Sequence, residues 1–307
     1  MSQDTLGSLI RNAGTNAEFL AARGRSETGS LLESEFKFSR DLSTSRPRLS
    51  TRQLIEYMRA LDAHIAANFP KVTARRVMLM QEELEKRLLT SSGSDAFTLL
   101  PRALIYVTLT AENAGAEPVE VMEMFTEGGA NFEDRFDDPK SLFPRLDTAY
   151  EHLCRKLEAV PARAGRKTVI LDTHLTGILA HEAVGHTTEV DFVLGSSVAG
   201  EYLVRKVASE LITMVDFAHT YEGKQVPIPV WIDDEGTEAS DALLIHKGVL
   251  EGFMHSRDTA AHFGHELTGN ARAFLFSDEP LIRMRNCNGV DFTEASGIYG
   301  FMAMGMR

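Results

Sequence analysis

The stretch Ile178-Leu-Ala-His-Glu-Ala-Val-Gly-His-Thr-Thr-Glu-Val-Asp191 carries the densest chemistry in this sequence of 307 residues. Two imidazoles can bind a divalent metal such as zinc, and a carboxylate beside the first can move protons on a water that the metal activates. We therefore expect the rest of the chain to form a scaffold for this stretch. Within eleven residues it holds five side chains of ligand type, which are His181, Glu182, His186, Glu189 and Asp191.

The spacing of the two histidines argues against a regular helical metal site. Side chains four residues apart share one face of an α-helix, whereas side chains five apart, such as His181 and His186, lie about 140° apart. Either the helix ends or bulges between them, for which Gly185 is a candidate, or they are unrelated helix residues. Spacing alone leaves both interpretations open.

The carboxylates of the stretch have two interpretations as well. Glu182 could act as general base and then as general acid in a metal-assisted hydrolysis. Glu189 and Asp191 could bind the metal, or orient an imidazole from behind it. Alternatively, these acidic residues form a solvated helix end.

Composition and charge indicate a globular protein without a nucleic acid or a membrane as its main partner. Hydrophobic residues make up 43% of the chain and charged residues 25%, and the net charge is -12. The two cysteines, Cys154 and Cys287, lie far apart and form no disulfide framework, which favours a reducing compartment. No signal peptide and no run of eighteen apolar residues is evident, so we expect a cytoplasmic protein.

The first half of the chain predicts helices packed on an antiparallel sheet. Ser50-Thr-Arg-Gln53 is a capping box that begins an amphipathic helix, and Pro70 ends it. The segments 99–109 and 119–125 are typical of strands that pair with each other. Ser141 is a candidate cap for a further helix, whose apolar stripe runs to Leu157.

The basic segment 161–167 predicts a boundary between a domain of residues 1–165 and one of residues 166–307. A buried strand at 168–172 is expected to lead directly into the motif. The segment 243–254 indicates a hairpin that turns at Lys247-Gly248. The second half is therefore expected to contain one helix followed mostly by β-structure.

These residues resemble a known family in several places. His181-Glu-Ala-Val-Gly-His186 followed by Glu189-Val-Asp191 is similar to the H-E-x-x-x-H motif in the TldD-type branch of the TldD/PmbA metallopeptidases. The resemblance covers roughly residues 50–286 and is specific because its motifs agree in order and spacing. The further matching segments are Ile232–Gly236, Ile245–Met254, Leu267–Arg272 and Pro280–Asn286.

The resemblance implies a fold and an activity that spacing does not supply. It implies an α+β protein, with an N-terminal domain of antiparallel sheet and helices, and a β-rich, barrel-like C-terminal domain that carries the motif helix. By it, His181 and His186 bind zinc and Glu182 is the catalytic acid/base. It implies cleavage of short or unfolded peptides by a homodimer, or by a heterodimer with a PmbA-type sister subunit. It also favours a strand pair over residues 77–90, where propensity favours a helix.

The sequence departs from the family pattern after Asn286, where the Cys-Gly segment that completes the family's zinc site is absent. We therefore expect a C-terminally truncated member with an incomplete C-terminal domain. The third ligand stays open among Glu189, Asp191 and Cys287. The resemblance places the loop Thr268-Gly269-Asn270 near the substrate, and His262 and His265 before it are expected in a polar loop. The alternative function is an inactive homologue that binds a peptide or a partner subunit.

Overall fold

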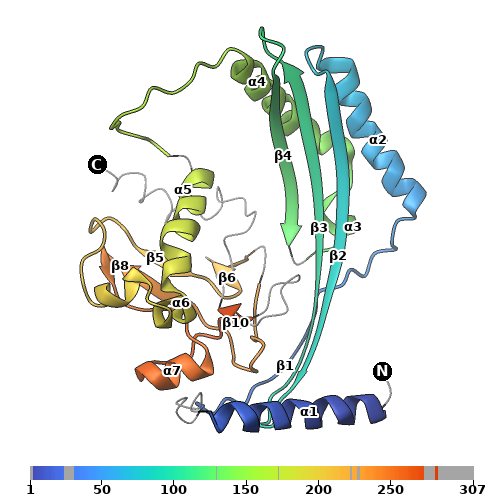
Figure 1. Cartoon of the computed structure of the whole chain (residues 1–307). Helices are drawn as coiled ribbons and strands as arrows, with labels where there is room; N and C mark the ends of the chain where they lie inside the picture. The colour runs from blue at the N-terminus through green and yellow to red at the C-terminus, as the bar shows by residue number, and fades with distance from the viewer. Residues whose placement is uncertain are drawn as a thin grey trace.

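The protein has a long curved sheet with helices in its N-terminal half and a compact group of shorter elements in its C-terminal half (Figure 1). The α+β class is therefore confirmed. The computed structural model describes residues 3–23, 31–128, 130–171, 173–221, 223–226, 229–272 and 281–282.

The large sheet is built on two successive antiparallel hairpins. Strand β3 (Asp95–Glu112) pairs along its length with β2 (Ala74–Leu89) and on its other side with β4 (Pro118–Gly128). The pairing predicted between 99–109 and 119–125 is confirmed. A fourth strand, β1 (Lys37–Asp41), joins the beginning of β3 in parallel, which the predicted antiparallel sheet did not include.

Strand β2 resolves the conflict over residues 77–90 in favour of extended structure. Residues 77–89 of this segment belong to one continuous strand of 16 residues, β2, rather than to a helix or a strand pair. Its sequence contains Glu82, Glu83 and Glu85, which have helical propensity, but every residue of β2 has a cross-strand partner on β3. Tertiary pairing here outweighs local preference, as it commonly does for strands.

Two helices cover one face of this sheet. Helix α2 (Thr51–Asn68) begins at the predicted capping box, in which the side chains of Ser50 and Gln53 each accept a hydrogen bond from the other's backbone N–H. Helix α4 (Phe143–Leu157) lies beside it (Figure 1). Its predicted cap, Ser141, is wrong, because a 3-10 turn at Pro139–Leu142 comes first and Asp138 accepts the capping bond from Lys140 N–H.

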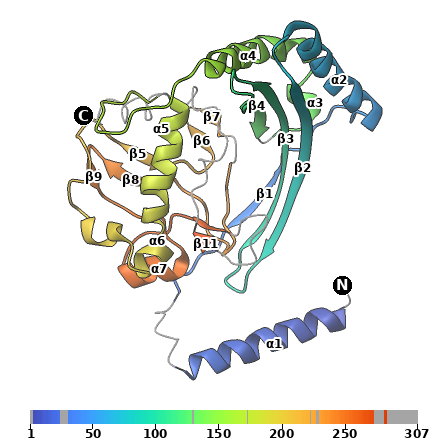
Figure 2. The same ribbon diagram turned by 45° about the horizontal axis from the view of Figure 1, so that its top comes forward.

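The apolar core of this half follows the period-two pattern of β3. Alternate residues of the strand face the helices and are buried. The buried residues of this core include Ala103, Ile105, Val107, Leu109 and Ala111 of β3, Tyr57, Leu61 and Ile65 of α2, and Leu146, Ala149 and Leu153 of α4. Two further helices belong to this half, α1 (Gln3–Ala21) and α3 (Phe132–Arg135). Helix α1 stands apart from the rest of the protein (Figure 2).

The second half begins with a segment that contradicts the predicted strand at 168–172. Residues 168–171 belong to no strand, and Ile170 is 90% exposed, while residue 172 lies outside the described residues. This apolar run of strand type is irregular, and no strand among the described residues pairs with it. The chain then enters helix α5 (Thr173–Leu179), which leads into the motif.

The β-structure of this half consists of short strands, and the described residues do not close into a barrel. The hairpin predicted at Lys247-Gly248 is confirmed, and both of its turn residues have positive φ. The elements after the motif are α6 (Val190–Leu194), β5 (Met214–Asp216), β6 (Thr220–Tyr221), β7 (Lys224–Gln225), β8 (Ala242–His246), β9 (Val249–Leu250), α7 (Arg257–Phe263), β10 (Ala271–Arg272) and β11 (Leu281–Ile282).

Each half has its own hydrophobic cluster, and the exposed segment 159–170 lies between them in the chain. The division at residues 165 and 166 stays a prediction. The two halves touch where the β2–β3 hairpin meets the loop after Trp231. There Lys86 pairs with Asp234, and the Ser94 hydroxyl donates to the carbonyl of Gly236 at 2.8 Å.

No helix among the described residues combines the length and the apolar character needed to cross a membrane.

Candidate metal centre

The motif backbone changes its helical type at the point where the histidines occur. Helix α5 continues as a π-helical segment over Ala180–Gly185, and a 3-10 turn follows at His186–Thr188. The backbone N–H of His186 donates to the carbonyl of His181, which is the i to i+5 bond of a π turn. Because a π turn holds more residues than an α turn, side chains five apart come onto one face.

This backbone decides between the two interpretations that spacing left open. The rings of His181 and His186 lie edge to face, with their centroids 4.3 Å apart. One potential ligand atom from each of His181, Glu182 and His186 falls in a group whose members all lie within 4.8 Å of one another. The helix bulges, as one interpretation required, and the bulge spans the whole interval that ends at Gly185.

Glu189 contacts the far side of the second imidazole. Its Oε1 lies 2.7 Å from Nδ1 of His186, and the Glu189 side chain is completely buried. A carboxylate accepts hydrogen bonds, so this contact favours the tautomer with the proton on Nδ1. The Nε2 atom of His186, which lies 3.9 Å from Glu182 Oε2, then remains as the metal-binding nitrogen.

The other predicted ligands are not part of this group. Asp191 lies partly buried in the first turn of α6, and the group of three within the described residues does not include it. Cys287 lies outside the described residues. Glu189 and Asp191 therefore differ in position, since the first contacts an imidazole of the group.

The predicted substrate loop Thr268-Gly269-Asn270 is built into the β-rich framework. Thr268 Oγ1 accepts a hydrogen bond from the backbone N–H of His255 at 2.8 Å, and Asn270 Nδ2 donates to Asp216 Oδ2 at 2.8 Å. Gly269 has φ +64°, and a Cβ there would lie 2.6 Å from the carbonyl oxygen of Glu238. These contacts give the loop a structural role, and its predicted role in binding substrate stays a prediction.

The burial of two titratable groups, Asp233 and His255, was not predicted from the sequence. Asp233 is completely buried, and burial raises the pKa of its carboxyl to about 6. Burial, with His265 nearby, lowers the pKa of the His255 imidazole to about 4. The rings of His255 and His265 are stacked with centroids 5.1 Å apart. No periodic pattern in the sequence signals either burial.

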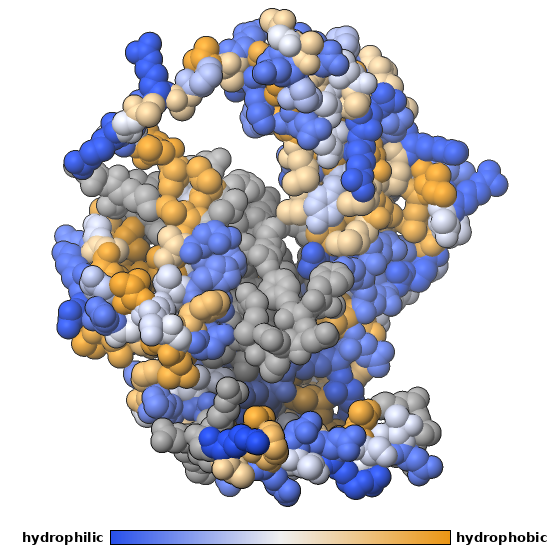
Figure 3. All heavy atoms as spheres, in the orientation of Figure 1, coloured by the Kyte–Doolittle hydropathy of each residue, from blue (hydrophilic) through white to orange (hydrophobic). Residues whose placement is uncertain are grey.

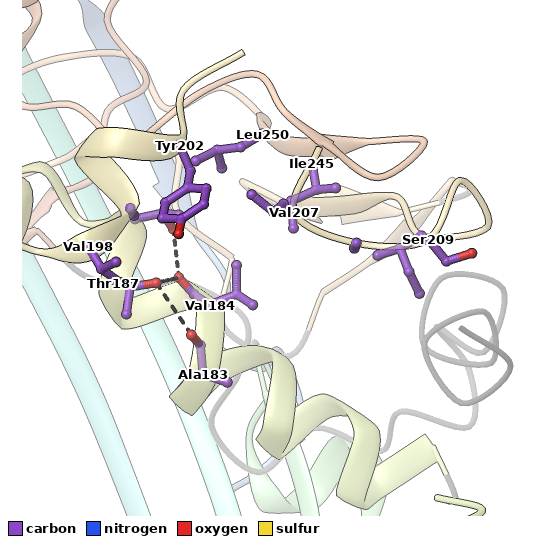
Figure 4. A pocket seen from close by; sticks show the side chains of 13 residues that line it. Ala183, Val184, Thr187, Val198, Tyr202, Val207, Ser209, Ile245 and Leu250 are labelled. Atoms are coloured by element: carbon purple, nitrogen blue, oxygen red, sulfur yellow. Dashed lines mark hydrogen bonds between the residues drawn. The ribbon is translucent and has the colours of Figure 1, made fainter. Parts of the chain in front are cut away.

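An apolar pocket of about 380 Å³ lies beside the motif (Figure 4). Ala183, Val184 and Thr187 form its wall on the motif side, and Ile245 and Leu250 contribute from the β8–β9 hairpin. Hydrophobic side chains are also visible on the surface over α5 and α6 (Figure 3). The exposed apolar side chains of α6 and of the segment that follows it in the chain are Phe192, Leu194, Val198, Tyr202, Val204, Val207 and Leu211.

The donor set of the motif fits zinc. Imidazole nitrogen and carboxylate oxygen are its usual ligands besides thiolate, at about 2.0–2.2 Å from the ion. Ligand atoms within 4.8 Å of one another need only a small closure to share one ion. The buried Glu189 behind His186 is the kind of carboxylate partner that metal-binding histidines commonly have.

The fold and this group of residues define an α+β protein with a candidate metal centre. Residues 164–294 match the PmbA/TldA metallopeptidase C-terminal domain. A metalloprotease of Methanothermobacter thermautotrophicus is 32% identical over 241 residues, which are 78% of this chain and 50% of that protein. A zinc metalloprotease TldD homologue of Saccharolobus solfataricus is 32% identical over 180 residues, which are 58% of this chain and 39% of that protein.

A solved structure agrees with these matches. TldE from Thermococcus kodakarensis superposes with a TM-score of 0.57 at 17% identity, over 85% of this chain and 57% of that one. The chain belongs to the TldD/PmbA family. It spans about half the length of the curated relatives that it matches, or less.

Proposed function

We propose that this chain is a zinc-dependent peptidase of the TldD type that cleaves short or unfolded peptides. The observation that carries the proposal is the π turn, since it brings His181, Glu182 and His186 together at the spacing that a regular helix forbids. The names of the relatives, metalloprotease and zinc metalloprotease, support the same conclusion.

Each residue of the group has a distinct role in this proposal. His181 and His186 would hold the ion, and Glu189 accepts a hydrogen bond from Nδ1–H of His186, which leaves Nε2 unprotonated. Zinc, when bound, supplies Lewis-acid polarisation of the scissile carbonyl and of a water. Glu182 would take a proton from the attacking water and give it to the leaving amine. Its side chain is 64% exposed, so a peptide can reach it.

The third ligand remains among the candidates that the sequence offers. Glu189 is already engaged with His186, which makes an orienting role the better assignment for it. Asp191 and Cys287 stay as candidates, and the loop 268–270 stays a proposed contact for the substrate. Glu182 itself is close enough to bind the ion, so its role needs a direct test.

The proposed test separates proton transfer from metal binding at Glu182. Glu182→Gln is expected to keep one zinc per chain and to lose about 10²–10⁴-fold in the hydrolysis of an unstructured fluorogenic peptide, the usual range for general acid–base catalysis. Metal content by mass spectrometry and hydrolysis rate are measured on the same samples. Glu158→Gln, an exposed glutamate at the end of α4, is the matched control.

The outcomes distinguish the assignments. Loss of zinc in Glu182→Gln would make Glu182 a ligand. Wild-type protein that binds no zinc and cleaves no peptide would refute the peptidase proposal and leave the inactive, peptide- or subunit-binding homologue.

The proposal includes a partner and a location. The likeness to TldE supports pairing with a second copy or with a PmbA-type subunit. A cytoplasmic location rests on the low cysteine count of the sequence, which favours a reducing compartment. Light scattering of the chain alone, and after mixing with a PmbA-type protein, measures whether the chain pairs with a second copy or with that protein.

A further inference from the structure

The 3-10 turn that follows the π turn carries two threonine hydroxyls that donate hydrogen bonds back into the π turn. Thr188 Oγ1 lies 2.9 Å from the carbonyl oxygen of Gly185 and 3.1 Å from that of Val184. Thr187 Oγ1 lies 2.8 Å from the carbonyl oxygen of Val184 (Figure 4). Both hydroxyls therefore bind carbonyls at the join between the π turn and the 3-10 turn, where the backbone hydrogen-bond pattern changes.

Thr188 is also the point where the motif is attached to the β-rich core. Its side chain is buried, and its carbonyl accepts a hydrogen bond from the backbone N–H of Met254 at 3.0 Å. The backbone N–H of Val190 donates to the carbonyl of Met254 at 3.3 Å. Thr187 is tied as well, because its carbonyl accepts from Ser197 Oγ at 2.8 Å.

These contacts connect the framework to the spacing of the histidines. The backbone of Thr188 is fixed by the core, and its hydroxyl reaches back to the last carbonyls of the π turn. If this turn relaxed to a regular α-helix, His181 and His186 would point about 140° apart. A local bond that favours the π turn therefore favours the geometry in which both imidazoles reach one ion.

We infer that Thr188 is a positioning residue that holds the π turn and thereby sets the separation of His181 and His186. Thr187 assists through the carbonyl of Val184. The inference rests on the proposed metal site, and it concerns how the chain holds its two histidines rather than which group catalyses. Neither threonine touches the ion or the substrate in this assignment.

The experiment compares Thr188→Val with Thr188→Ser in the full chain. Valine keeps the shape of threonine and removes the hydroxyl, whereas serine keeps the hydroxyl. Cobalt(II) is the probe, because its affinity and the visible spectrum of its bound form both report ligand geometry. Thr237→Val, which removes another buried hydroxyl outside the motif, is the matched control, and circular dichroism checks folding.

We expect Thr188→Val to bind cobalt about 10- to 100-fold more weakly than wild type, the range found when outer partners of metal ligands are removed. Its spectrum should change, while Thr188→Ser and Thr237→Val retain wild-type affinity and spectrum. Rescue by serine would assign the effect to the hydroxyl.

Three results would overturn the inference. They are wild-type cobalt binding and spectrum in Thr188→Val, an equal loss in Thr188→Ser, and an equal loss in Thr237→Val. If Thr188→Val does not fold, the partly exposed Thr187→Val takes its place. It is expected to weaken cobalt binding several-fold, and unchanged binding would count against the inference. Wild-type protein that binds no cobalt would instead refute the proposed metal site.

Discussion

The buried imidazole of His255 predicts a loss of stability in mild acid. Burial lowers its pKa from the ordinary 6.5 to about 4, so the folded protein keeps it neutral at pH 5. In the unfolded chain the same imidazole is protonated below about pH 6.5. The stabilising contribution is therefore complete above pH 6.5 and is lost as the pH falls from 6.5 toward 4.

The size of the effect follows from the pKa difference. Between pH 6.5 and pH 5.0 the imidazole is protonated in the unfolded state but stays neutral in the folded state. Over this range of about 1.5 pH units, the unfolding free energy falls by about 1.4 kcal/mol per unit. His255 should thus remove about 2 kcal/mol of unfolding free energy between pH 7.5 and pH 5.0. The neutral variant His255→Gln should lack this contribution, whatever its stability at pH 7.5.

Urea unfolding at the two pH values measures this difference directly. The loss between pH 7.5 and pH 5.0 should be about 2 kcal/mol smaller in His255→Gln than in wild type. His246→Gln, which changes an exposed histidine on β8, should retain the wild-type loss. Equal losses in wild type and His255→Gln would refute the reasoning, because a titrating His255 could not then be the cause.

The remaining predictions concern an acid, a turn and a cap, all measured by chemical unfolding. Burial raises the pKa of Asp233 to about 6, so its stabilising contribution is complete below about pH 4 and is lost as the pH rises through 6. Asp233→Asn should remove this loss of about 3 kcal/mol, and an unchanged pH profile would contradict it. Gly248→Ala should cost about 2 kcal/mol or more, because φ is +83° and the new Cβ would lie 2.5 Å from the Ala208 carbonyl oxygen; near-wild-type stability would exclude this clash. Ser50→Ala should cost about 1 kcal/mol through loss of the capping box with Gln53, whereas Ser50→Thr should cost much less.

Local sequence signals correctly predicted those helices and turns that depend on neighbouring residues. The capping box at Ser50, the stripe ending at Leu157 and the turn at Lys247-Gly248 each depend on neighbouring residues, and each lies where it was predicted. Ser141 failed as a cap, since the chain forms an earlier 3-10 turn. The motif likewise supplied the identity of the donor atoms, because imidazole and carboxylate chemistry belongs to the side chains themselves.

Long-range contacts decided the features of the fold that local sequence signals did not predict. Residues 77–89 have helical propensity but lie in one strand, because β3 provides each of them with a partner. Residues 168–171 are apolar but join no sheet. The burial of Asp233 and His255 depends on packing between segments that are distant in the chain, so no local pattern announced it.

The motif at 178–191 shows both contributions, that of the sequence and that of the tertiary structure. The sequence determined by itself that two histidines and a glutamate occur within six residues, and that five-residue spacing cannot place both imidazoles on one face of an α-helix. Only the tertiary structure decided that the backbone forms a π turn there. The physical reason lies in long-range contacts. The 3-10 turn that follows the π turn ends at Thr188, whose backbone is bonded to Met254 in the β-rich core and whose hydroxyl binds the last carbonyls of the π turn.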